Sequence, residues 1–139
     1  MVPATIADYE ILIYSLFDDY PSIHSSTLRV IRTSPTSGQI IGHLTFANDI
    51  QLKVAEIVDF DSGYLEILQY GYTVYKDEKQ LYWYDSQPHP NDPTLASSHP
   101  HHKHIPPGIK HHRVPAHDLS FTRPNLSFLI TEIVKLLGL

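Results

Sequence analysis

The chain has 139 residues, of which 42% are hydrophobic and 18% charged, a composition typical of globular proteins and not of disordered ones. The net charge is −5 and there is no cysteine, which excludes disulfide bonds, thiolate zinc sites and cysteine nucleophiles. No N-terminal basic region leads into an apolar run, and no apolar run reaches membrane-spanning length. We therefore expect one cytoplasmic domain over residues 1–139, without a membrane segment.

Helical periodicity marks both ends of the chain. An N-terminal helix is predicted within residues 1–20, with Thr5 as its N-cap and Pro21 after its end. A C-terminal helix is predicted over 125–137, with Asn125 as its N-cap and Gly138 after its end. The apolar residues at helical spacing are Ile6, Tyr9, Ile13, Leu16 and Phe17 in the first helix, and Leu126, Leu129, Ile130, Ile133, Val134 and Leu137 in the second.

Between these helices the apolar pattern changes to period two, which is typical of strands. Strands are predicted at 26–33, 39–46, 50–58, 64–75 and 80–84, with short polar turns between them. Short connections between successive strands favour an antiparallel meander, so residues 26–85 should form a sheet of about five strands. The helices should cover one face of that sheet, which makes the fold class α+β.

Residues 86–124 show little periodicity and contain eight prolines. A connection of this length in a compact domain is usually functional or disordered, and we expect an extended His/Pro-rich loop along the sheet. Seven of the ten histidines lie between residues 84 and 113: His89, His99, His101, His102, His104, His111 and His112. Imidazole is the side chain that changes its charge near neutral pH without help, so this density indicates a function.

Charge is also concentrated there. Residues 93–117 contain no Asp or Glu, and Lys103, Lys110 and Arg113 give the window a charge of +3. Against the overall charge of −5, this leaves −8 on the rest of the chain. An acidic body with one basic, histidine-rich segment favours a local anion site over a surface that coats DNA.

These residue types suit RNA cleavage without a metal. The reaction needs a base for the 2′-hydroxyl proton, an acid for the leaving oxygen and a cation near the phosphate. The core catalytic candidates are His101, His102, His104 and Lys103, supported by His99, Asp85 and Tyr84. Candidates for nucleic-acid binding are the cations Lys103, Lys110 and Arg113 and the aromatic residues Tyr82 and Trp83, which could stack on bases.

Three other interpretations remain open from the residues alone. The cluster could bind zinc or another divalent transition metal, with Asp85, His89 or Asp92 completing the ligands, as a metal-binding domain or metal-dependent hydrolase. It could serve a non-catalytic module that binds a protein or an anion. Each histidine could also be structural, and this is our interpretation of His24 and His43.

Several short segments between residues 43 and 104 resemble the TumE family of small bacterial toxins. They are HLTFAND at 43–49, LKVAE at 52–56, YGY at 70–72, YDSQPH at 84–89 and HPHHKH at 99–104, the last being the most specific. The resemblance implies a cytoplasmic growth inhibitor neutralised by a cognate antitoxin, typically a helix-turn-helix protein. RNA as the substrate is our inference from the residues above and from what such toxins commonly act on. Whether the chain forms a homodimer is left open.

Overall fold

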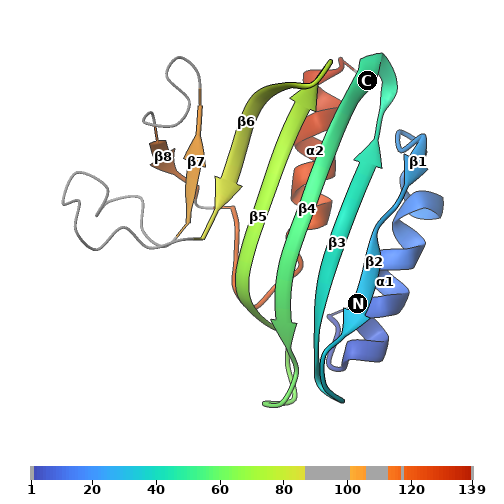
Figure 1. The fold of residues 1–139 in the computed structure, drawn as a ribbon, viewed down its shortest axis with the longest axis vertical. Helices are drawn as coiled ribbons and strands as arrows, with labels where there is room; N and C mark the ends of the chain where they lie inside the picture. Colours follow the sequence, from blue (N-terminus) through green and yellow to red (C-terminus); the bar gives the residue numbers. More distant parts are fainter. Residues whose placement is uncertain (1, 87–100, 106–112, 117, 139) are drawn as a thin grey trace.

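The described part of the chain forms one antiparallel sheet with two α-helices, so the fold class is α+β as predicted (Figure 1). The computed structural model describes residues 2–86, 101–105, 113–116 and 118–138. Its elements in chain order are α1 (Ile6–Asp19), β1 (Ser25–Ser26), β2 (Arg29–Arg32), β3 (Ser37–Thr45), the short 3-10 helix η1 (Ala47–Asp49), β4 (Ile50–Asp59), β5 (Glu66–Lys76), β6 (Lys79–Asp85), β7 (His102–His104), β8 (Arg113–Pro115) and α2 (Leu126–Leu136).

The strand order across the sheet is β1-β3-β4-β5-β6-β7-β8, and β2 also pairs with β3. The four long strands, β3 to β6, are each antiparallel to the next one in the chain. This confirms the predicted meander, because short turns between alternating segments can join only antiparallel neighbours. Neither described helix combines the length and the apolar composition needed to cross a bilayer.

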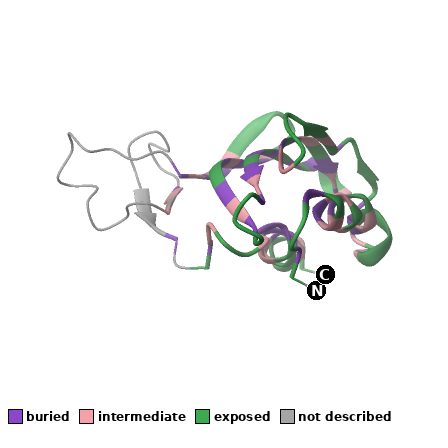
Figure 2. Cartoon of the chain, turned by 90° about the horizontal axis from the view of Figure 1, so that it is seen from below, coloured by how far each residue is buried: buried purple, intermediate pink, exposed green. Residues whose placement is uncertain are grey.

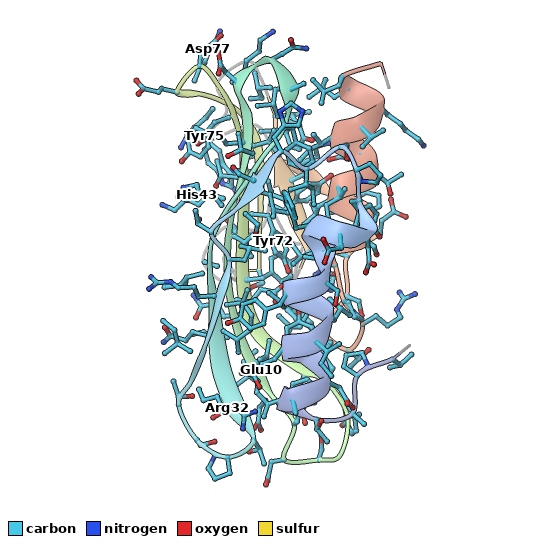
Figure 3. All side chains as sticks on the ribbon, turned by 90° about the vertical axis from the view of Figure 1, so that its right-hand side faces the viewer. Glu10, Arg32, His43, Tyr72, Tyr75 and Asp77 are labelled. Atoms are coloured by element: carbon cyan, nitrogen blue, oxygen red, sulfur yellow. The ribbon has the colours of Figure 1, made fainter. Side chains whose placement is uncertain are left out.

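Both helices pack on the same face of the sheet, and the buried residues gather between the helices and the strands (Figures 1 and 2). In β4, Ile50, Leu52 and Val54 are buried, whereas the alternate residues are exposed, as the period-two pattern predicts. Neither of the described helices covers the other face of the sheet, and His43 and Tyr75 point out from it while Tyr72 points toward the helices (Figure 3). We call these two sides the helix face and the open face.

The predicted strand at 26–33 is wrong as one continuous element, because it is divided into β1 and β2. Leu28 lies between the two pieces and is buried, and both pieces pair with β3. The interruption faces Gly42 of β3, which has a φ of +137° and approaches the backbone of Thr27 closely. A glycine inside a strand pattern often marks such an irregularity.

The predicted loop over 86–124 is also only partly correct, because its described part contains two strands. β7 pairs with β6 through Trp83↔His104, Tyr84↔Lys103 and Asp85↔His102, and β8 pairs with β7. Each strand has three residues and no apolar alternation, so the sequence carries no period-two pattern to predict it. The sheet therefore has more strands than the five expected.

The predicted start of α1 is confirmed, since the Thr5 hydroxyl accepts a hydrogen bond from the Asp8 amide at 3.1 Å. Phe17, however, is 48% exposed and does not belong to the buried stripe. Gly138 follows α2 with a φ of +73°, as expected for a helix end. Asn125 occupies the N-cap position of α2 but makes no capping bond, because its side chain is bonded to Ser120 and Tyr72 instead.

Candidate functional site

Strand β7 places its two described side chains, Lys103 and His104, on opposite faces of the sheet. Successive side chains of a strand point to opposite faces, and paired residues share a face. Lys103 is paired with Tyr84, which is buried on the helix face, whereas His104 is paired with Trp83 on the open face. Neighbours in the sequence are thus separated by the thickness of the sheet.

On the open face, His104 contacts a carboxylate and an indole. Its Nε2 lies 3.0 Å from Oδ2 of Asp85, and its ring stacks on Trp83 with centroids 4.4 Å apart. His104 is 3% exposed, while the side chain of Asp85 is 22% exposed. A carboxylate in this position fixes the orientation of the imidazole. Asp85 is therefore the member of the pair that a ligand on the open face would meet first.

On the helix face, Lys103 is held by α2 and by aromatic rings. Its Nζ lies 3.4 Å from Oε2 of Glu132, 4.3 Å from the Tyr82 ring centroid and 5.2 Å from that of Tyr84. The Tyr84 hydroxyl donates to Glu132 at 2.8 Å, and burial followed by the Glu132 carboxylate raises the pKa of Tyr84. The charge of Lys103 is thus balanced within the fold, and the Tyr82 ring, at 9% exposure, is packed and not offered to a base.

His101 has a separate environment just before β7. Its Nδ1 lies 2.5 Å from the hydroxyl of Tyr70, and its ring packs on Phe121 with centroids 4.3 Å apart. Burial, and then the charge of Asp85, raise the pKa of Tyr70, so its hydroxyl stays protonated near neutral pH. Because Tyr70 is a core residue of the helix face, the structure does not bring the rings of His101 and His104 together.

A hollow of about 380 Å³ lies on the open face beside Asp85. The cross-strand row Ile41, Ala55, Gly71 and Asp85 runs through it. Ala55 and Gly71 carry almost no side chain, so the row is depressed at its middle. The lining residues are Gln39, Ile41, Ala55, Glu56, Ile57, Gln69, Tyr70, Gly71 and Asp85. Sequence reasoning missed this hollow, although Gly71, which stands between two tyrosines in strand β5, was a signal for it.

Several predicted site residues fall outside the described residues. They are His99 and Lys110, and the side chains of His102 and Arg113, whose backbones belong to β7 and β8. Among the described residues, no group of three or more His, Asp and Glu could hold a metal ion. The metal interpretation stays a prediction, since His89 and Asp92 also lie outside them.

A comparison with protein families matches most of the chain to one family. The family model described as Toxin TumE matches residues 13–137, which include the sheet, β7 and both sides of the hollow. No curated protein and no solved structure matches the chain significantly. The match agrees with the resemblance found in the short segments between residues 43 and 104 and extends it to the second half of α1 and to α2. The chain belongs to the Toxin TumE family.

Proposed function

We propose that this chain is the toxin of a toxin–antitoxin pair and that it arrests growth by cutting RNA at the open face. Membership of a toxin family supports the first part and implies a cognate antitoxin. The observation that carries the second part is the Asp85–His104 contact of 3.0 Å at the edge of a hollow. Among the candidate residues on the described strands, Asp85 and His104 alone join a carboxylate–imidazole pair to a cavity on the open face.

The proposed reaction is a transesterification within the RNA. The Asp85–His104 pair takes the proton of a 2′-hydroxyl, and the 2′-oxygen forms a bond to the adjacent phosphorus. The bond from phosphorus to the 5′-oxygen then breaks, and that oxygen receives a proton from the now protonated pair. The products are a 2′,3′-cyclic phosphate and a 5′-hydroxyl, so atoms and charge balance without a metal or another reactant.

The other predicted catalytic residues take different positions in this proposal. Lys103 and Tyr84 are bound to Glu132 on the helix face, so we assign them to holding α2 against the sheet. His101 is bound to Tyr70, on the same side of the sheet, and remains a candidate only as a positioning residue. A helix-turn-helix antitoxin, a cytoplasmic location and a homodimer remain proposals.

The first prediction concerns Asp85→Asn and His104→Gln. Each substitution keeps the size of the side chain and removes its ability to exchange a proton, so we expect RNA cleavage by the full chain to fall by about 100-fold or more. His24→Gln is the matched control, because His24 is exposed and lies before β1, away from the hollow. Cleavage is measured on a short end-labelled RNA, with the new ends tested for a cyclic phosphate and a 5′-hydroxyl.

Growth on induction without an antitoxin gives the second readout. The two variants should grow, and wild-type and His24→Gln cells should stop. Arrest by Asp85→Asn and His104→Gln at the wild-type level would contradict the assignment of these residues. Arrest by the wild-type chain with intact cellular RNA, and with no cleavage in the purified assay, would contradict RNA cleavage and favour a non-catalytic binding function.

A further inference from the structure

The open face has a second depression next to the hollow. It measures about 660 Å³ and is lined by β1 to β4, at Ser26, Thr27, Leu28, Arg29, Ile41, Gly42, His43, Lys53, Val54 and Ala55. Ile41 and Ala55 line both depressions, so the two are continuous across β3 and β4. Together they form a path from the β2 edge of the sheet to Asp85, whose carboxylate contacts His104, and we call this path the open-face groove.

One end of the open-face groove is basic. Arg29, His43 and Lys53 are exposed there, and the paired positions His43 and Lys53 are direct cross-strand neighbours. Within the described part of the chain, neither Arg29 nor Lys53 forms an ion pair, whereas Arg32 is paired with Glu10. Unpaired cations gathered on an uncovered face of a chain with a net charge of −5 indicate an anionic ligand.

The other end of the groove suits a planar base. Gln39, Ile57 and Gln69 are paired across β3, β4 and β5, so two amides flank one apolar side chain at the hollow. Each amide has donors and an acceptor that can bond the edge of a nucleobase. A base can enter such a hollow only when it is unstacked, which is the condition of bases in single-stranded RNA and not in a duplex.

We propose that the open-face groove binds single-stranded RNA, with backbone phosphates at Arg29, His43 and Lys53 and one base in the hollow between Gln39 and Gln69. This inference rests on the proposed function, for which it supplies the substrate class and the way the substrate lies. Gly71 is the cross-strand neighbour of Asp85, so a base seated on Ala55 and Gly71 would lie beside Asp85.

Binding is tested with a fluorescent single-stranded RNA and full-length protein carrying Asp85→Asn, so that cleavage does not interfere. Adding Arg29→Gln and Lys53→Gln should weaken binding by about 10-fold at low salt. It should also reduce the slope of log affinity against log salt by about 1.4, since each lost phosphate contact on a single strand contributes roughly 0.7. The matched control is Arg123→Gln with Lys135→Gln, which removes two exposed cations near or on α2 and should change neither quantity.

A second variant tests the hollow itself. A Cβ at Gly71 meets no atom within 4 Å, and the φ of Gly71 is not positive, so Gly71→Val fits the strand and fills the hollow. We expect about 10-fold weaker RNA binding with an unchanged thermal midpoint. Thr73→Val, on the same strand and the same face but outside the lining, is the control and should bind like the parent.

The outcomes separate this inference from the proposed function. Binding of the Arg29/Lys53 and Gly71 variants at the parent level, while the wild-type chain still cuts RNA, would overturn the groove and leave the catalytic proposal. Loss of binding in these variants, with no cleavage by the wild-type chain, would support the groove and overturn the catalytic proposal. Equal affinity for a duplex of the same sequence would overturn the single-strand assignment.

Discussion

Replacing Tyr9 and Tyr72 together by phenylalanine is expected to lower the free energy of unfolding by about 3–5 kcal/mol. Both hydroxyls donate hydrogen bonds to the carboxylate of Glu56, the one from Tyr9 at 2.5 Å. Glu56 is 2% exposed and sits in the core between the sheet and the helices. Without the two hydroxyls this buried carboxylate loses both donors that the structure gives it among the described residues, and the cost of its burial is no longer offset.

The same network joins most layers of the fold. Tyr9 comes from α1, Glu56 from β4 and Tyr72 from β5, and Asn125, which precedes α2, donates from Nδ2 to the Tyr72 hydroxyl at 3.1 Å. Asn125 is thereby used to connect α2 to the sheet instead of capping the helix. The hydroxyls must stay protonated to donate, and burial, with Glu56 as the next cause, raises the pKa of both tyrosines.

The effect should depend on pH with a definite sign. Burial raises the pKa of Glu56 above its ordinary 4.5, while the bonds from Tyr72 and Tyr9 lower it in part. Between 4.5 and the raised pKa the folded chain binds more protons than the unfolded chain, so stability falls as pH rises through this window. Removing the two hydroxyls raises the pKa of Glu56 further. The variant should therefore lose more stability relative to wild type at alkaline pH than at acidic pH.

Urea unfolding of wild type and variant at a mildly acidic and a mildly alkaline pH tests both the loss of stability and its dependence on pH. Tyr64→Phe is the matched control, because Tyr64 is 52% exposed, and its change should stay within about 0.5 kcal/mol. Glu56→Gln has no carboxylate to ionise and should remove this part of the pH dependence. A double variant as stable as wild type at both pH values would mean that the network contributes nothing to the fold.

The fold was largely predictable because apolar and polar residues alternate clearly along the long strands. In β4 every second residue is buried, and this alternation runs through Ile50, Leu52 and Val54 to Glu56. The sequence pattern therefore places the Glu56 carboxylate in the core. The pattern could not predict the hydrogen-bond partners of Glu56, because Tyr9 and Tyr72 lie 47 and 16 residues away in the sequence. The strands β7 and β8 were missed for a related reason: each has only three residues, too few to show an apolar alternation, and is paired with its neighbour through the backbone.

The candidate site was predictable only in part. The density of histidine in the sequence led to a predicted site at one segment, but closeness in the chain does not mean closeness in space when the segment is a strand. Pairing with β6 turns Lys103 toward Glu132 and His104 toward Asp85. Asp85, predicted as a supporting residue of the site, lies 3.0 Å from Nε2 of His104. The hollow arises from two small residues on different strands, Ala55 and Gly71, which only the register brings together.

Replacing Gly42 by alanine should be the most damaging of the conservative changes on the sheet, with a loss of about 3 kcal/mol or more in the free energy of unfolding. An added Cβ would lie 2.5 Å from the carbonyl oxygen of Thr27 and 2.8 Å from Cα of Leu28. These are backbone atoms and cannot move aside as the end of a side chain can. The φ of +137° adds conformational strain for any residue with a Cβ.

Two other glycines separate these contributions. Gly63 has a φ of +86° with no atom within 4 Å of an added Cβ, so Gly63→Ala carries only the conformational strain, about 1 kcal/mol. Gly71 has neither the strain nor a neighbour, so Gly71→Ala should be close to neutral. Urea unfolding should therefore rank the three variants Gly42, Gly63 and Gly71 from most to least damaging. If Gly42→Ala costs no more than Gly63→Ala, the close approach of β3 to Thr27 is not what requires glycine there, and the break between β1 and β2 needs another cause.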